Sequence, residues 1–417
     1  MTRIERWRWT VLALLFASTA INYIDRQALA VLLPTLRNEL GLTGSDYGAI
    51  STMFLAAYTV GQLLMGAVVD RIGTRPGLML AIIIWSLASM GHALAGGFVT
   101  LLALRVVLAL GESGNWPAGA KAVSEWFPRH RRAFAMGVLD GGSAIGAVLA
   151  PPLVAWLAHR YGWRAAFLLT GAIGFLWLAA WAVSYWPPRE HRKLNVEERR
   201  EAGEEAGQSG KRLGFGAGVK LAGSSGALWG LMVTRMVATP VWWFYVFWLP
   251  DYLSKGRGFS LAEIGMFGWI PFLTVDAGKL AGGAASDRLL GGGWKPAKAR
   301  KTVMASGALL MMAGLAVVEA PSAAAAIAWV SVATFGFGIW SANILALHSD
   351  FFPSEAMASA VGMTTMAASI GGACFTWWVG RTVDASGYGP VFLAAGLLAL
   401  AALAALLLLV KRRESAE

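Results

Sequence analysis

Several charged residues stand inside long apolar runs of the chain, where an ionised side chain is costly. One run contains Asn22-Tyr23-Ile24-Asp25-Arg26, and a later run contains Arg105 and Glu112. A charge at the centre of a membrane helix costs at least roughly 2.5–3.5 kcal/mol, so such residues usually mark function. A guanidinium offers a planar fork suited to a carboxylate, and a carboxyl group can carry a proton. This chemistry suits the binding of an organic acid together with a proton.

Arg105 and Glu112 are seven residues apart, which places them two turns apart on one face of a helix. Burial favours the neutral acid, whereas a nearby arginine favours the carboxylate. A Glu112 held between these influences can gain and lose a proton, which proton coupling needs. The alternatives are a permanent buried salt bridge or, for Arg26, a structural pair with Glu112. Asp25 and Arg26 lie about 100° apart on a helix, so they need not pair with each other.

The apolar runs show what kind of chain positions these groups. The 417 residues are 57% hydrophobic and 14% charged, against roughly 45–50% and about 25% in ordinary soluble domains. One span of the bilayer core needs roughly 20 apolar residues. The composition therefore predicts an all-α membrane protein. It argues against a soluble enzyme, a disordered chain and, with Cys374 as the one cysteine, a disulfide scaffold.

Twelve transmembrane helices are predicted, six on each side of a polar stretch. The first six fall near 10–33, 47–69, 77–95, 98–122, 133–156 and 165–186, and the second six near 228–250, 261–284, 302–320, 324–348, 357–380 and 389–410. The predicted domains are a first bundle (1–186), a cytoplasmic linker with a short amphipathic helix (187–226), and a second bundle with a short cytoplasmic tail (227–417).

The Lys and Arg residues predict the orientation. If both termini face the cytoplasm, the inside segments hold 24 of the 35 and the outside loops hold 6, which is the bias that the positive-inside rule describes. We therefore expect a multi-pass protein of the bacterial inner membrane with cytoplasmic termini and a retained first helix. The net charge is +11, and the Lys and Arg residues that cause it stand mainly in short gaps between apolar runs. A nucleic-acid partner is therefore not expected.

The two halves of the chain repeat one another. The Phe-Pro, alanine and glycine positions between Phe127 and Gly146 recur between Phe352 and Gly371 at a constant offset of 225 residues. Two six-helix halves related by duplication are the architecture of a secondary transporter, with its site near the midplane where the repeats meet. Chance recurrence of loop glycines and Phe-Pro turns is the alternative.

A second repeat pairs Gly66-Ala-Val-Val-Asp70-Arg71 with Gly283-Ala-Ala-Ser-Asp287-Arg288. Glycine lets helix ends approach closely, and charged groups at the membrane edge can bond a neighbouring helix terminus. We expect Asp70, Arg71, Asp287 and Arg288 to act as gating latches that break when the cytoplasmic side opens. A solvated charge pair is the alternative.

These elements carry a family resemblance. The latch resembles the signature loop of the major facilitator superfamily, and Arg105 to Pro128 resembles the fourth helix of its anion:cation symporter branch. Within that branch the chain is similar to the hexuronate transporters in long runs of both halves, such as Trp242 to Pro250 and Trp340-Ser-Ala-Asn343. The resemblance implies the major facilitator fold, with two pseudo-symmetric bundles of six helices.

The resemblance also implies roles for individual residues. It assigns Arg26 to the acid group of the substrate, Glu112 to the main proton site, Asp25 to a second one, and Arg105 to tuning them. A sugar acid also presents hydroxyl groups, which need neutral donors, acceptors and ring faces. The substrate-binding residues that we expect are Tyr23, Arg26, Tyr58, Ser143, Tyr245, Trp340, Ser341 and Asn343, with Tyr245 considered only as a gate residue.

The sequence departs from the family pattern at three places, one of which is Phe337-Gly338 in the tenth span, where these relatives often have a polar pair. Asp140 stands where relatives usually have asparagine, and an added acid there could repel substrate or act as another proton site. Lys279 stands where an uncharged residue is expected, and we interpret it as a structural i,i+3 pair with Asp276. Arg235, in the seventh span, either lines the cavity or snorkels toward the cytoplasm.

The predicted function is proton-coupled import of a small organic anion, a hexuronate or related sugar acid, by alternating access. The alternatives are uptake of another carboxylate, an exporter of the same fold, or a sensor that binds ligand without accumulating it. An enzyme is not expected, because no nucleophile, base or metal cluster stands in the spans. The sequence also lacks a Walker-type loop. We expect no cofactor, the proton gradient as the energy source, and a monomer in the lipid bilayer.

Overall fold

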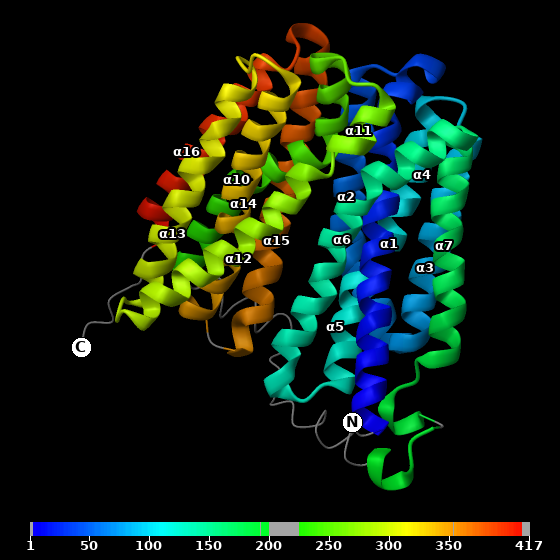
Figure 1. Ribbon diagram of the computed structural model, residues 1–417. Coiled ribbons are helices and arrows are strands. Elements are labelled where there is room, and N and C mark those ends of the chain that lie inside the picture. Colours follow the sequence, from blue (N-terminus) through cyan, green and yellow to red (C-terminus); the bar gives the residue numbers. More distant parts are fainter. Residues whose placement is uncertain (1–2, 192, 200–224, 353, 411–417) are drawn as a thin grey trace. The chain divides into compact units, whose positions relative to one another are not determined.

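The computed structural model describes residues 3–191, 193–199, 225–352 and 354–410 (Figure 1). Within these ranges every regular element is a helix. The residue contacts divide the chain into two units. Unit 1 comprises residues 1–42, 53–210 and 261–266, and unit 2 comprises 43–52, 211–260 and 267–417. The first turns of the second span thus belong to unit 2, and a short segment near residue 264 belongs to unit 1.

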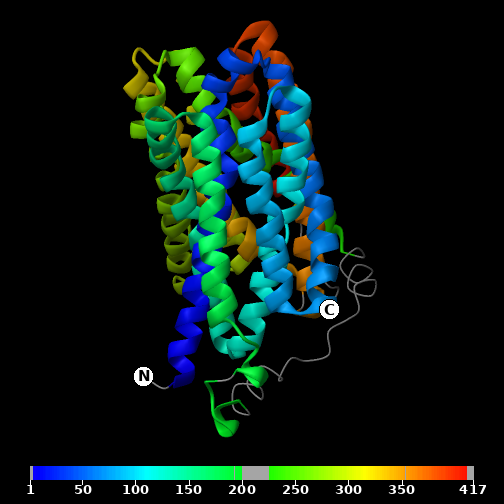
Figure 2. The same cartoon turned by 90° about the vertical axis from the view of Figure 1, so that its right-hand side faces the viewer.

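Unit 1 contains seven helices and two short 3-10 turns, except that the first turns of α2 belong to unit 2. They are α1 (Arg3–Leu40), α2 (Gly44–Ile72), α3 (Thr74–Gly91), η1 (His92–Leu94), α4 (Phe98–Glu112), α5 (Asn115–Trp126), α6 (Arg129–Tyr161), α7 (Trp163–Ser184) and η2 (Pro188–Glu190). Helix α1 packs against both α6 and α7, as the two views of the ribbon show (Figures 1 and 2). The N-terminal helix is therefore at the centre of the packing in this unit.

Unit 2 contains a second set of helices. They are α10 (Gly226–Asp251), η3 (Tyr252–Gly256), α12 (Ile270–Gly291), α13 (Pro296–Met311), η4 (Met312–Val317), α14 (Ala323–Phe351), α15 (Ser354–Ser386) and α16 (Gly389–Leu409), while α11 (Leu261–Phe267) joins unit 1 up to Met266. Helix α14 packs on α12 and α13, and α10 packs on α15 and α16. Gly278, Gly282 and Gly338 allow α12 and α14 to approach closely, because a side chain at any of them would meet the neighbouring backbone.

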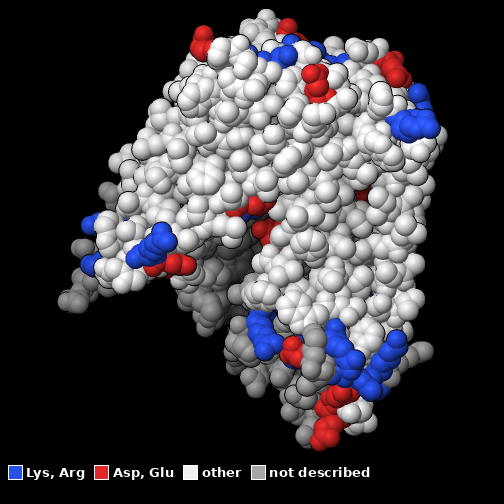
Figure 3. All heavy atoms as spheres, in the orientation of Figure 1, with Lys and Arg blue, Asp and Glu red and all other residues white. Residues whose placement is uncertain are grey.

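The helices confirm the all-α membrane fold. Eight helical segments in the described residues are long and apolar enough to cross a membrane, and α1, α10, α12 and α15 are four more helices of 22 residues or longer. Together these make twelve helical segments long enough to cross a membrane in the described residues. The space-filling view shows charged side chains gathered mainly at the helix ends of each unit, with mostly uncharged surface along the sides (Figure 3). Such a surface suits contact with lipid.

Two predicted spans are interrupted. The fourth span, predicted as continuous over 98–122, breaks between α4 and α5, and the eighth, predicted over 261–284, breaks between α11 and α12. At the first break, a Cβ on Gly111 would lie 2.6 Å from the backbone nitrogen of Trp85, so glycine there lets α4 press against α3. Glu112 is the last residue of α4, at the interruption.

The predicted linker helix cannot be placed, since residues 200–224 lie outside the described residues. Before them, the chain leaves α7 at Tyr185, whose hydroxyl donates to Glu125 of α5. Thr74 at the start of α3 donates to the other oxygen of the same carboxylate over 2.6 Å. Burial raises the pKa of the Tyr185 phenol, so it stays a donor at neutral pH. This cluster ties together three helix ends of unit 1.

Candidate functional site

Arg26 and Glu112 form a buried ion pair in unit 1. The Nε of Arg26 donates to Oε2 of Glu112 over 2.9 Å, and Nη2 lies 2.8 Å from the same oxygen. Nη2 also donates to Oδ1 of Asn22, one turn earlier on α1, over 3.1 Å. The side chains of Arg26 and Glu112 are 2% and 0% exposed. The pair that the sequence offered as an alternative for Arg26 is therefore present.

Aromatic rings surround the Arg26 guanidinium. Its central carbon lies 4.8 Å from the ring centre of Tyr23, 5.3 Å from that of Phe54 and 4.6 Å from that of Tyr58. A cation near an aromatic face is attracted by the ring quadrupole, by about 2 kcal/mol or more where water is excluded. These rings stabilise the cation without neutralising it, so Arg26 keeps its charge for an acid partner.

Each buried carboxylate in this cluster has one oxygen without a donor in the described structure. Oε1 of Glu112 and Oδ2 of Asp25 are inaccessible to water and have no hydrogen-bond partner among the described residues. The other oxygen of Asp25 accepts a hydrogen bond from Ser89 of α3 over 2.8 Å. A buried carboxylate oxygen with no donor is costly, and a proton on that oxygen removes the charge. Both acids are thus suited to holding a proton.

Arg105 of α4 completes the cluster. Its Nη2 donates to the backbone carbonyl of Arg26, and its guanidinium lies 4.8 Å from the ring centre of Phe54. The structure therefore brings together four predicted residues: Asp25, Arg26, Arg105 and Glu112. The predicted Tyr23 and Tyr58 lie beside Arg26. The proton-coupling and tuning roles of these residues stay predictions.

The sequence interpretation missed Phe54 and Ser89, and it gave Asn22 no role. Phe54 precedes Tyr58 by four residues, so helical spacing placed the two rings on one face of α2. Their centres are 5.9 Å apart in the structure. Ser89 gives no such signal, because a serine in an apolar helix has many possible partners. Only the tertiary structure, in which α3 and α1 both pack on α7, identifies it as a donor to Asp25.

Ser143 lies in α6 of unit 1 and is 6% exposed. Its hydroxyl donates to the backbone carbonyl of Asp140 over 2.6 Å, which is a common use of serine within a helix. No contact in the described residues joins it to Arg26. Its substrate role stays a prediction.

The predicted substrate residues of unit 2 are occupied by structural contacts. Asn343 Nδ2 donates to the carbonyls of Gly282 and Ile339, at 3.2 and 3.0 Å, and Ser341 donates to the carbonyl of Gly338 over 3.0 Å. Trp340 is 2% exposed. Asn343 thus joins α14 to α12. The carbonyl oxygen of its amide and the hydroxyl of Ser341 are the groups through which these two residues can still accept a bond.

Tyr245 lies in the interior of unit 2. It is 1% exposed, and its ring centre lies 5.2 Å from that of Phe244. Tyr245 belongs to a continuous buried stretch of α10 from Phe244 to Asp251, where the helix is buried on every side. Its gate role stays a prediction.

The four predicted latch residues are all exposed to solvent. Asp70 is exposed and lies 3.2 Å from the Lys121 ammonium, which also donates to the carbonyl of Val69. Arg71, Asp287 and Arg288 are exposed as well. The contact with a helix end is made by Arg75 instead, which donates to the carbonyl of Ala182 over 2.5 Å and lies 3.7 Å from the Trp186 ring centre. The gating role stays a prediction.

The charged pair of the eighth span is formed as expected. Lys279 Nζ lies 3.1 Å from Asp276 Oδ1, and both side chains are partly exposed.

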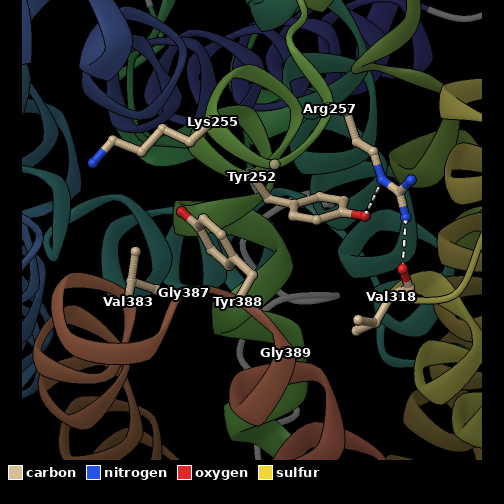
Figure 4. A pocket seen from close by; sticks show the side chains of 9 residues that line it. Tyr252, Lys255, Arg257, Val318, Val383, Gly387, Tyr388 and Gly389 are labelled. Carbon is tan, nitrogen blue, oxygen red and sulfur yellow. Dashed lines mark hydrogen bonds between the residues drawn. The ribbon is translucent and has the colours of Figure 1, made fainter.

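A separate cavity of about 300 Å³ lies in unit 2 at the end of α10 (Figure 4). Tyr252, Lys255, Arg257 and Tyr388 line it. Arg257 donates to Tyr252 Oη over 2.7 Å, to the carbonyl of Ala320 over 2.8 Å, and to the carbonyl of Val317. The hydrogen bonds of Arg257 therefore connect the end of α10 to the chain around residues 317–320 beside this cavity.

The comparisons with known proteins agree with this arrangement. Residues 15–376 match the sequence profile of the Major Facilitator Superfamily. The chain is 34% identical to a hexuronate transporter of Escherichia coli K12, over 94% of this chain and 91% of that protein. It is 36% identical to a galacturonate transporter of Dickeya chrysanthemi, over 68% and 82%. The solved structure of a D-xylose-proton symporter has the same fold, with a TM-score of 0.77, 16% identity, and coverage of 97% and 98%.

The fold and the family match define a twelve-helix, multi-pass membrane transporter rather than an enzyme. The chain belongs to the Major Facilitator Superfamily.

Proposed function

We propose that this transporter carries a hexuronate or a related sugar acid into the cell together with protons. The observation that carries the proposal is the buried Arg26–Glu112 pair enclosed by aromatic rings. The relatives named as hexuronate and galacturonate transporters support the substrate class. The same proposal includes an inner-membrane location with cytoplasmic termini, a monomer, and the proton gradient as the energy source without a cofactor.

The coupling follows from competition for one cation. A substrate carboxylate that binds Arg26 takes the position of Oε2 of Glu112, which then loses its charged hydrogen bonds. An unpaired charge in a low-dielectric interior costs several kcal/mol, so Glu112 takes up a proton when substrate binds. The substrate anion and the proton therefore bind together. Release reverses the exchange, because Arg26 draws the carboxylate of Glu112 back as the substrate leaves.

Asp25 supplies a second proton site in this scheme. Ser89 donates to one of its oxygens, and no arginine forms a direct bond with it among the described residues. A proton on Asp25 removes a negative charge near the incoming anion. Import of a monoanion with more than one proton is electrogenic, so the membrane potential then contributes to accumulation.

The test is uptake of radiolabelled glucuronate into proteoliposomes, with and without an inward proton gradient. Glu112→Gln keeps the shape of the side chain and removes its proton exchange. The wild type is expected to accumulate glucuronate only with the gradient. Glu112→Gln is expected to lose accumulation at least tenfold while still exchanging internal for external glucuronate. Gly137→Ala, a change on α6 of the same unit where an added Cβ meets no atom within 4 Å, controls for reconstitution.

Two results would contradict the proposal in different ways. No glucuronate flux by the wild type under either condition would remove the hexuronate assignment and direct the search to other carboxylates. Accumulation by Glu112→Gln at the wild-type level would remove the coupling role of Glu112 while leaving the substrate assignment intact.

A further inference from the structure

Unit 2 holds a guanidinium that no acid neutralises in the part of the chain that the structure describes. Arg235 stands on α10, and its Nη1 donates to Oγ1 of Thr364 over 3.1 Å and to Oγ1 of Thr365 over 3.0 Å. Both threonines belong to α15. The side chain is only partly exposed. Arg26, by contrast, has a carboxylate within 2.8 Å.

The position of Arg235 argues against simple snorkelling. It follows the first residue of α10 by nine residues, which is about 13 Å along the helix, and Thr364 follows the first residue of α15 by ten residues, about 15 Å. The Arg235 guanidinium thus bonds to hydroxyl groups on α15 that lie at a similar distance from the start of their own helix. Arg235 thus carries a charge within a membrane helix that no acid neutralises in the described residues, and such charges usually mark function.

The hydroxyl groups around Arg235 are arranged to receive an anion. Thr364 Oγ1 donates to the carbonyl of Val361 over 3.0 Å and lies 2.8 Å from Nε2 of His348, so its position is fixed. Thr365 accepts from Arg235, and its own hydroxyl proton has no acceptor among the described residues. A small anion beside Arg235 would receive charge-assisted bonds from the guanidinium and a further bond from Thr365, as carboxylates prefer.

We propose that Arg235 and Thr365 form a second anion site, which takes one carboxylate group. Thr364, fixed by His348, positions the guanidinium. The assignment of its natural ligand as the carboxylate of the transported acid rests on the proposed function. A site without its own carboxylate binds an anion without having to displace a partner. Arg235 is, however, less buried than Arg26, so water competes for its guanidinium, and we expect the ligand to bind it more weakly and to leave it faster than Arg26.

The test is thermal unfolding of the purified full chain in a chloride-free buffer. The fluorescence of the protein's own tryptophans reports the unfolding. Glucuronate, acetate and chloride are titrated separately, because they distinguish a sugar acid, any carboxylate and any small anion. The variants are Arg26→Gln, Arg235→Gln, the double variant, and Thr365→Val, which keeps the charge. Arg381→Gln is the matched control, since it removes a unit 2 cation that lies on the Trp377 ring, 3.9 Å from its centre.

The expected result is two phases of stabilisation by glucuronate in the wild type. Arg26→Gln should keep the weaker phase, and Arg235→Gln should keep the tighter one. The double variant should lose both, while Arg381→Gln resembles the wild type. Thr365→Val should weaken the second phase about three- to tenfold. Acetate should stabilise Arg26→Gln through the same Arg235-dependent phase. If Arg235→Gln does not fold, the comparison of Thr365→Val with wild type still tests the site.

Several results would overturn the proposal. Loss of every anion response in Arg26→Gln would leave no second site, as would an unchanged second phase in Arg235→Gln or Thr365→Val. A second phase that responds to chloride and to neither carboxylate would remove its role in binding a carboxylate. An Arg235-dependent response to acetate, with no glucuronate binding or uptake by the wild type, would refute the proposed function and leave the second site intact.

Discussion

Arg26 on α1 of unit 1 and Arg235 on α10 of unit 2 both lie within apolar runs, and their surroundings are opposite in kind. Arg26 on α1 is fully buried, bonded to Glu112 and enclosed by aromatic rings. Arg235 on α10 is partly exposed and bonded to hydroxyl groups alone. An arginine with its own carboxylate exchanges one acid for another and so links anion binding to protonation. An arginine held by hydroxyls attracts an anion without that exchange.

The comparison is tested most strongly by removing the Arg26 charge. Arg26→Gln leaves Glu112 buried without its partner, which should cost about 3–5 kcal/mol of stability and abolish transport. The double variant Arg26→Gln/Glu112→Gln should recover most of the stability and none of the transport. Unfolding curves and glucuronate uptake measure the two effects. Recovery of transport in the double variant would show that the pair is only structural.

A smaller effect is expected where α4 breaks beside the ion pair. Gly111→Ala places a Cβ 2.6 Å from the backbone nitrogen of Trp85, so α4 must move away from α3. Overpacking of this kind typically costs about 1–3 kcal/mol. The displacement of Glu112 should also raise the KM for substrate. Gly137→Ala on α6 meets no atom within 4 Å, and it should leave both quantities unchanged.

The aromatic rings around Arg26 distinguish it further from Arg235. Phe54→Leu keeps an apolar side chain and removes a ring that faces both Arg26 and Arg105. The loss of these contacts should weaken glucuronate binding about 5- to 30-fold, which corresponds to about 1–2 kcal/mol. Isothermal calorimetry measures it. The weak, Arg235-dependent phase should be unaffected, and a parallel loss there would show that the two sites are not independent.

The smallest effect is expected at the ends of the unit 1 helices. Tyr185→Phe removes one hydrogen bond to Glu125 and keeps the ring stacked on Trp181. A hydrogen bond to a charged group contributes about 1.5–3 kcal/mol at most, and Thr74 still donates to Glu125. We therefore expect a loss of about 1 kcal/mol in stability and unchanged glucuronate affinity. A change in affinity would mean that this cluster reaches the site.

The sequence by itself determined the class of the protein. Twelve apolar runs separated by short polar gaps require twelve membrane helices, because backbone groups in lipid must be bonded internally. The same reasoning identified Arg26 and Glu112, since a charge in such a helix is rarely accidental. Helix breaks were harder to predict. The interruption after Glu112 lies just before Pro117, which has no N–H to bond the carbonyl of residue 113, but the apolar run continues through it.

Only the tertiary structure decided which groups meet. Periodicity relates residues on one helix, so Arg105 and Glu112 were recognisable as sharing a face. The bond from Arg26 to Glu112 and the bond from Ser89 to Asp25 span 86 and 64 residues. Burial likewise placed Tyr245 inside unit 2 and left Arg235 with two threonines from a distant helix. Such partners depend on the packing of whole helices, which no local pattern encodes.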